Sequence, residues 1–174
     1  KLMYGIDLFD RIRMPLDWTL VYYGINNDIL SINIAQEFAC RKLEHDEHMS
    51  EEELELTWTS KNRQDVLELI ERILSIHGNV DESIEKAKDK ICIAIIIYLR
   101  DTEKDIGRLL EQIDIIYADF GYPEDMEKFI TYMPSNDEYN PLKHKLEDNR
   151  YYLLSKLDDF INEKMKEYQL ERVM

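Results

Sequence analysis

The run Lys90-Ile-Cys-Ile-Ala-Ile-Ile-Ile-Tyr-Leu-Arg100 determines the kind of fold to expect. Its apolar residues point in every direction around a helix, and a helix that is apolar on all sides must be covered on all sides. The polar lead-in Asp81 to Asp89 has helical spacing, acidic residues in its first turn, and no Gly or Pro before the run. A buried strand is the alternative, because Ile is β-branched and the run is short. We favour a central buried helix over roughly 82–100.

The rest of the chain also has the spacing of amphipathic helices. Its 174 residues include only five glycines and four prolines, so few turns and long elements are expected. We predict an all-α fold, a single-domain bundle of about eight helices spanning residues 1–174. A peripheral helix is expected within 1–14, and a long C-terminal helix within 141–174 places Leu146 and Leu157 inward. The other predicted helices cover 18–23, 31–43, 50–58, 62–77, 102–117 and 123–133.

Several functional classes do not fit the composition. The apolar run is much shorter than the roughly 20 residues that span a bilayer, and no signal peptide is recognisable. Cys40 and Cys92 lie in apolar helical contexts, which favours free thiols in a reducing compartment. We therefore expect a cytoplasmic protein. A net charge of −15 repels phosphate backbones and anionic lipids, so nucleic acid and membranes are not expected as partners.

The distribution of charge is more informative than its total. Residues 101–140 hold eleven Asp and Glu against three Lys and Arg, which makes this part the most acidic per residue. A surface of this sign attracts basic proteins. The alternative is that the acidic surface only keeps the protein soluble.

No catalytic motif is recognisable in the sequence. The scattered glycines exclude both a P-loop and a dinucleotide-binding fingerprint, and Asp119-Phe120-Gly121 lacks every other element of a kinase. The sharpest candidate for a metal site is Glu44-His45-Asp46-Glu47-His48, in which His45 and His48 could clasp Zn²⁺. Its spacing is not that of a zinc protease, and a solvated loop is the default interpretation. We predict no cofactor.

Tyrosines cluster with acidic residues on both sides of Gly121. Tyr beside Asp and Glu is typical of a surface that grips a basic protein, although such rings can also simply pack helix corners. We predict that the partner-binding residues are Asp119, Tyr122, Glu124, Asp125, Glu127, Asp137, Glu138 and Tyr139.

Two segments resemble a known family. They are Asp17-Trp-Thr-Leu-Val-Tyr-Tyr-Gly24 and Ile116-Tyr-Ala-Asp-Phe-Gly-Tyr-Pro-Glu-Asp-Met126, the second followed by Phe129-Ile130 and Tyr132-Met-Pro134. Together they are similar to the bacterial domain of unknown function 2247 family, over roughly residues 15–170. The resemblance implies a small helical bacterial cytoplasmic protein and supplies no catalytic residues. Small acidic bacterial proteins of this type often act as immunity proteins that block a cognate toxin. This analogy rests on the type of protein and not on a shared motif.

These observations favour a non-enzymatic binding module. We expect an acidic surface that binds a basic protein, with a toxin domain that the chain neutralises by occlusion as the partner. The alternatives are a structural subunit of a homo-oligomer and a metal-dependent enzyme that uses His45 and His48.

Overall fold

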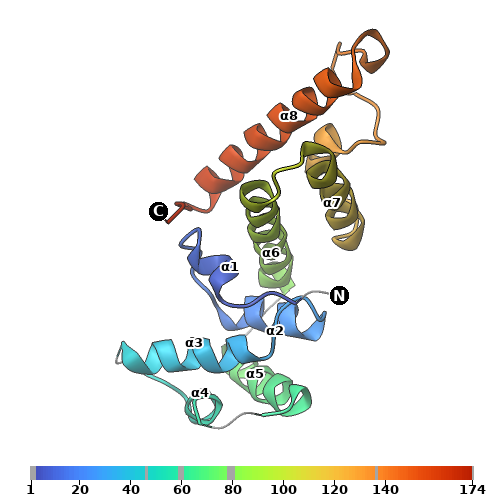
Figure 1. Ribbon diagram of the computed structural model, residues 1–174. Helices are drawn as coiled ribbons and strands as arrows, with labels where there is room; N and C mark the ends of the chain where they lie inside the picture. The colour runs from blue at the N-terminus through green and yellow to red at the C-terminus, as the bar shows by residue number, and fades with distance from the viewer. Residues whose placement is uncertain (1–2, 46, 59–60, 78–80, 136, 174) are drawn as a thin grey trace. The chain divides into compact units, whose positions relative to one another are not determined.

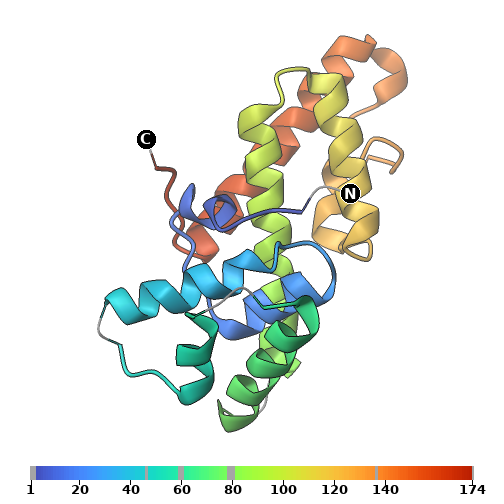
Figure 2. The ribbon, with the colours of Figure 1, turned by 60° about the horizontal axis from the view of Figure 1, so that its bottom comes forward.

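The computed structural model describes residues 3–45, 47–58, 61–77, 81–135 and 137–173. Its regular elements within these ranges are helices, with one isolated β-bridge, so the predicted all-α class is confirmed (Figure 1, Figure 2). The chain divides into two compact units, residues 1–91 with 172–174 (unit 1) and residues 92–171 (unit 2). That the units make up one domain stays a prediction. No helix in the described ranges has the length and apolar character needed to cross a membrane.

Helix α6 (Asp81–Thr102) contains the apolar run. Every residue from Ile91 to Ile97 is at most 4% exposed, as expected for a helix with no polar face. The strand alternative is therefore wrong. The predicted acidic first turn, at residues 81–83, lies outside the side chains that the structure describes. The boundary between the two units falls within this helix, after Ile91.

Unit 1 is built from short helices, and α5 packs against both α2 and α4, while α3 packs against α4. Asp17 caps α2 by accepting a hydrogen bond from the Leu20 amide at 2.8 Å, as its position before an apolar stretch predicts. The helices are α1 (Asp7–Asp10), α2 (Trp18–Asn26), α3 (Asn33–Glu44), α4 (Glu51–Leu56) and α5 (Arg63–His77).

The end of α2 requires a glycine. A Cβ atom on Gly24 would lie 2.2 Å from Leu30 Cδ1, and the Gly24 carbonyl accepts hydrogen bonds from the amides of Ile29 and Leu30. This close approach places Leu30 beside Tyr4, where the isolated parallel bridge forms. The N-terminal segment is thereby held in unit 1.

Unit 2 consists of the α6 residues from Cys92 onward, α7 (Ile106–Asp119), the 3₁₀ segments η1 (Glu124–Phe129) and η2 (Pro141–Lys143), and α8 (Leu146–Glu167). Helices α6 and α7 run in opposite directions in both views (Figure 1, Figure 2). Helix α8 packs against α7 and η1. Its Asp158 pairs with Arg100 of α6 at 2.7 Å, and Phe160 contacts Phe129 with ring centroids 4.9 Å apart.

The helix expected within 1–14 is present as the one-turn α1. Two other sequence predictions need correction. The helix expected over 123–133 is the 3₁₀ segment η1, which Pro123 precedes without a side-chain cap. Residues 141–174 do not form one helix, because His144 and Lys145 are extended and separate η2 from α8. As a result Leu146, which we expected inside, is 67% exposed at the start of α8.

Candidate functional site

Three tyrosines gather at the C-terminal end of α7. Tyr117 is 3% exposed, and the rings of Tyr122 and Tyr132 contact it with centroids 5.3 and 6.2 Å away. Tyr122 and Tyr132 are themselves 61% and 60% exposed. Two large exposed rings are thus held in place by one buried ring.

A left-handed turn presents Tyr122. Gly121 has φ of 79° and Tyr122 has φ of 60°, and the Tyr122 amide donates to the Tyr117 carbonyl at 2.9 Å. Two left-handed residues after the helix satisfy its last carbonyls and reverse the chain. A positive φ is costly for a bulky side chain other than Gly. The turn therefore keeps Tyr122 outside the core although it is aromatic.

Carboxylates surround these rings, and we call the whole group the tyrosine surface. Asp119 and Glu124 are exposed on either side of Tyr122 in sequence, and Glu127 is half-buried. Asp114 accepts hydrogen bonds from the amide and the hydroxyl of Thr131, next to Tyr132. The residues of the tyrosine surface are Asp114, Tyr117, Asp119, Tyr122, Glu124, Glu127 and Tyr132.

The environment raises the pKa of two of these tyrosine hydroxyls. Desolvation raises the pKa of Tyr117, and the charge of Glu127 raises it further. Desolvation also raises the pKa of Tyr132, with Asp114 adding to the effect. Both phenols are therefore neutral hydrogen-bond donors near pH 7. Donors beside carboxylates suit a partner that brings both cations and carbonyl oxygens.

Asp125, another predicted binding residue, ties η1 to α8. Its carboxylate lies 3.2 Å from Lys164 Nζ, and this ammonium also lies 5.7 Å from the centre of the Phe160 ring. The carboxylate is half-exposed, so the pair contributes little energy but fixes the position of the two segments.

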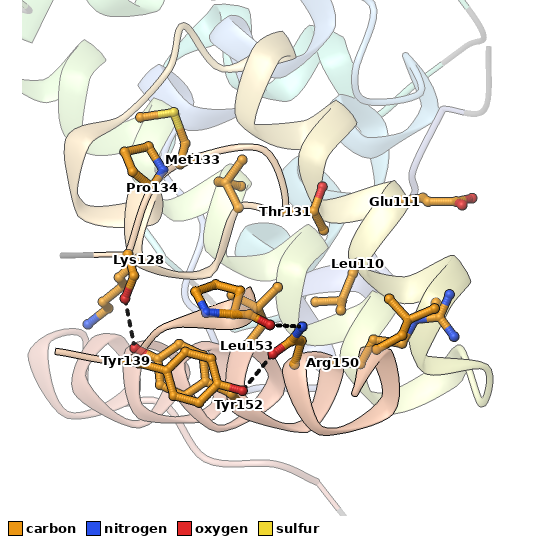
Figure 3. A pocket seen from close by; sticks show the side chains of 16 residues that line it. Leu110, Glu111, Lys128, Thr131, Met133, Pro134, Tyr139, Arg150, Tyr152 and Leu153 are labelled. Atoms are coloured by element: carbon orange, nitrogen blue, oxygen red, sulfur yellow. Dashed lines mark hydrogen bonds between the residues drawn. The ribbon is translucent and has the colours of Figure 1, made fainter. Parts of the chain in front are cut away.

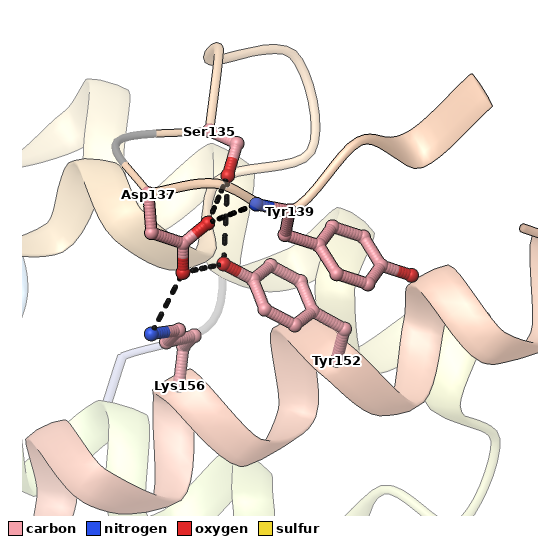
Figure 4. A network of polar contacts seen from close by, with 5 residues as sticks. All are labelled: Ser135, Asp137, Tyr139, Tyr152 and Lys156. Carbon is pink, nitrogen blue, oxygen red and sulfur yellow. Dashed lines mark hydrogen bonds and ion pairs between the residues drawn. The ribbon is translucent and has the colours of Figure 1, made fainter. Parts of the chain in front are cut away.

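Asp137 is engaged within the chain. Its carboxylate accepts hydrogen bonds from the Ser135 hydroxyl at 2.6 Å, from the Tyr139 amide at 2.9 Å and from the Tyr152 hydroxyl, and it lies 3.2 Å from Lys156 Nζ (Figure 4). The Ser135 hydroxyl, with the Tyr152 hydroxyl and the Tyr139 amide, holds the pKa of Asp137 well below its ordinary value. We call these five residues the Asp137 network.

Tyr139 is also engaged. Its ring is stacked between His144, 4.5 Å away, and Tyr152, 3.7 Å away, and its hydroxyl donates to Asn149 Oδ1 at 2.6 Å. Asp137 and Tyr139 thus hold the segment after Pro134 against α8. Glu138 between them is exposed. The structure separates the predicted binding residues into a group around Tyr122 and a group around Asp137.

A cavity of about 350 Å³ opens in unit 2 between α7, the 130–141 segment and α8. Its apolar lining residues include Leu110, Ile130 and Leu153. Tyr139 and Tyr152 lie one over the other along one side, and Lys128 and Arg150 lie at opposite ends (Figure 3). The cavity has the size of a small ligand pocket, and no sequence pattern indicated it.

A buried carboxylate in unit 1 was also not predicted. Glu53 is 5% exposed and accepts hydrogen bonds from Trp18 Nε1 at 2.9 Å and from the Ser50 amide at 3.1 Å, while Lys42 Nζ lies 2.7 Å away. Burial alone would raise the pKa of Glu53, but the hydrogen bonds from Lys42, Trp18 and Ser50 hold it below its ordinary value. Ser50 and Glu53 form a capping box, a local pattern that signals the cap but carries no signal of the burial.

Next to this carboxylate, unit 1 has an open cavity of about 560 Å³ lined by Trp18, Phe38, Lys42 and His45. His45 and His48 are exposed, and His45 Nδ1 lies 2.7 Å from the Arg41 carbonyl oxygen. Among the residues that the structure describes, no three His, Cys, Asp or Glu side chains are grouped to hold a metal ion. Asp46 of the candidate motif lies outside them.

A comparison with protein families matches residues 6–165 to a family described as an uncharacterized protein conserved in bacteria, DUF2247. The chain belongs to the DUF2247 family. Neither the curated proteins nor the solved structures contain a match to it. The family resemblance inferred from the two anchor segments is thereby confirmed, and both units of this DUF2247 chain fall largely within the matched range.

Proposed function

We propose that this DUF2247 protein is a binding module whose tyrosine surface holds a basic protein, and that the partner is a toxin domain neutralised by occlusion. The observation that carries the proposal is the exposure of Tyr122 and Tyr132 on the buried Tyr117. Monomeric proteins seldom leave such rings exposed side by side without a use, and Tyr is enriched where interfaces concentrate their energy.

Charge supports a basic partner. The carboxylates of Asp119 and Glu124 are exposed, and no Lys or Arg in the described part of the chain lies within ion-pair distance of either. They are free to steer a cationic surface toward the rings, which speeds association and gives it a steep salt dependence. The tyrosines then supply rigid apolar contacts with a polar tip.

The two groups of predicted residues have different roles in this proposal. Around Tyr122 the side chains contact the partner directly. Asp137 and Tyr139 instead position the segment that leads from Tyr132 to α8, because their polar groups are already bonded within the chain. Substitutions at Asp119 or Glu124 should therefore change the association rate, whereas substitutions at Asp137 should change the conformation of the segment.

The proposal is tested by charge reversal with a matched control. The wild-type protein, an Asp119→Lys, Glu124→Lys variant and a Glu37→Lys, Glu85→Lys control are immobilised, and proteins from the source bacterium are captured at low salt. The wild type and the control should retain a basic protein that the first variant does not. That protein, expressed alone, should arrest growth, and co-expression of the wild-type chain should relieve the arrest.

The quantitative step uses the purified partner. The charge reversal should slow association at least tenfold at low salt. The difference in association rate between the wild type and the reversed variant should shrink above about 0.1 M salt, where the Debye length falls below about 10 Å. If the reversed variant and the control bind the same proteins at the same rates, the tyrosine surface is not the binding site.

A further inference from the structure

A second exposed patch lies in unit 2, around the start of α8. Leu142 of η2 is 95% exposed and Leu146 at the start of α8 is 67% exposed. Neither leucine packs into the core, because the extended residues His144 and Lys145 separate η2 from α8 and turn both leucines outward. Apolar side chains this exposed, four residues apart in sequence, are typical of contact surfaces.

Three cations accompany the leucines. Lys143, Lys145 and Arg150 have no carboxylate within ion-pair distance in the described residues, whereas Lys156 and Lys164 of the same unit are both paired. Their charges are therefore available to carboxylates of another molecule. We call Leu142, Lys143, Lys145, Leu146 and Arg150 the basic leucine patch.

The patch borders the cavity of unit 2. Leu146 and Arg150 both line that cavity, and Figure 3 shows Arg150 at its end. Glu147 and Asp148 also lie near the patch, in the first turn of α8. There their carboxylates interact favourably with the positive end of the helix dipole. The cavity offers a recess of about 350 Å³ directly beside the exposed leucines.

Arg150 of the basic leucine patch and Tyr122 of the tyrosine surface lie near opposite ends of α7. Arg150 Nη2 would lie 2.9 Å from a Cβ atom on Gly107, at the start of this helix. Tyr122 follows Asp119, at its end. Twelve residues of helix separate the two positions, which is roughly 18 Å at 1.5 Å per residue. Arg150 therefore does not reach Tyr122 of its own molecule.

We propose that the basic leucine patch docks onto the tyrosine surface of a second copy of this chain. The charges are complementary, since Lys143, Lys145 and Arg150 would face the carboxylates around Tyr122 and Tyr132. Both surfaces carry exposed apolar side chains that such a contact would bury. Because the two surfaces are different, the contact is head-to-tail and builds a ring or an open chain.

This inference uses the same tyrosine surface as the proposed function but does not require a toxin. It predicts that a basic partner and a second copy compete for that surface. Self-association would then keep the exposed tyrosines covered until a tighter ligand displaces the second copy.

Two variants, each altered on one surface, provide the test. The patch variant is Leu142→Asp with Lys143→Glu and Lys145→Glu, and the tyrosine variant is Tyr122→Asn with Tyr132→Ser. All five side chains are exposed, and Asn tolerates the left-handed backbone at position 122. Circular dichroism checks that both variants keep the helical content of the wild type.

Sedimentation velocity at low salt gives the readout. The wild type and the Glu37→Lys, Glu85→Lys control should form species heavier than 20.9 kDa as concentration rises, and high salt should dissociate them. Each variant alone should remain at 20.9 kDa, and an equimolar mixture should form a species of twice that mass. This dimer cannot grow further, because each variant has only one intact surface. It forms only if the two surfaces are the two different halves of one contact.

Three results would overturn the inference: a monomeric wild type up to its solubility limit, self-association of the patch variant, or a mixture that stays monomeric. The proposed function is judged separately. The patch variant retains the tyrosine surface, so it should capture the basic partner as the wild type does even if self-association is never seen.

Discussion

Removal of the buried carboxylate of unit 1 is the perturbation whose size the structure defines best. In a Glu53→Ala variant, Trp18 Nε1 and the Ser50 amide lose their acceptor, and Lys42 loses its counter-ion. Trp18 is 7% exposed, so its N–H would have little access to water. The side chain of Lys42 is 21% exposed, so its ammonium can be rehydrated.

The expected loss follows from these three contacts. A buried donor left unsatisfied costs about 1–3 kcal/mol. Loss of half a capping box costs about 1 kcal/mol. Loss of the partly exposed ion pair adds about 1 kcal/mol or less. The variant should therefore lose roughly 3 kcal/mol of unfolding free energy, and its Tm should fall by about 6–12 °C for a chain of this size.

Tryptophan fluorescence is the appropriate assay, because both tryptophans, Trp18 and Trp58, belong to unit 1. Urea unfolding followed by this signal reports the unit that is perturbed. A Glu51→Ala variant is the control, because Glu51 is exposed in the same helical turn. A Glu53→Gln variant keeps an acceptor for Trp18 and should lose less free energy than Glu53→Ala.

The pH dependence provides a second check. The pKa of Glu53 is lowered in the folded state, so the unfolded state binds the proton more readily. The stability that the charged carboxylate contributes is complete above its ordinary value of 4.5 and is lost as pH falls through the lower folded-state value. The advantage of the wild type over Glu53→Gln should shrink in that range. A Glu53→Ala variant as stable as Glu51→Ala would refute the reasoning.

Three further predictions concern other contacts. Because the pKa of Asp137 is held low, its carboxyl carbon NMR signal should stay unshifted as pH falls through about 4, the ordinary range for Asp, and a midpoint there would contradict the network. A Gly24→Ala variant should lose roughly 1–3 kcal/mol because its Cβ would meet Leu30 at 2.2 Å, and an unchanged thermal midpoint would show that Leu30 can move away. The hydrogen bond that Tyr22 donates to Glu71 raises the pKa of Tyr22 to about 12, so in an alkaline absorbance titration Glu71→Gln should move one tyrosine back toward about 10.

The sequence predicted that unit 2 is acidic and rich in tyrosine. It did not predict which of these residues are available to a partner and which are bonded within the chain. Tyr122, Glu124 and Asp137 have the same appearance in sequence, as acids and rings in polar segments. In the structure all three are exposed, but only the carboxylate of Asp137 is engaged within the chain, by the hydroxyls of Ser135 and Tyr152. Tyr132, which we did not select, is as exposed as Tyr122. Which side chains a turn leaves free depends on neighbours that are distant in sequence.

Local chemistry by itself determined that this chain is helical and that the run beginning at Ile91 is buried, because an all-round apolar helix has no stable solvent-facing side. It also determined the capping box at Ser50, whose two bonds lie within one helical turn. Only the tertiary structure decided that Glu53 is covered and that Leu146 is exposed. Burial is a property of the segments that pack around a residue, and a carboxylate or a leucine carries no local signal of which segments those will be.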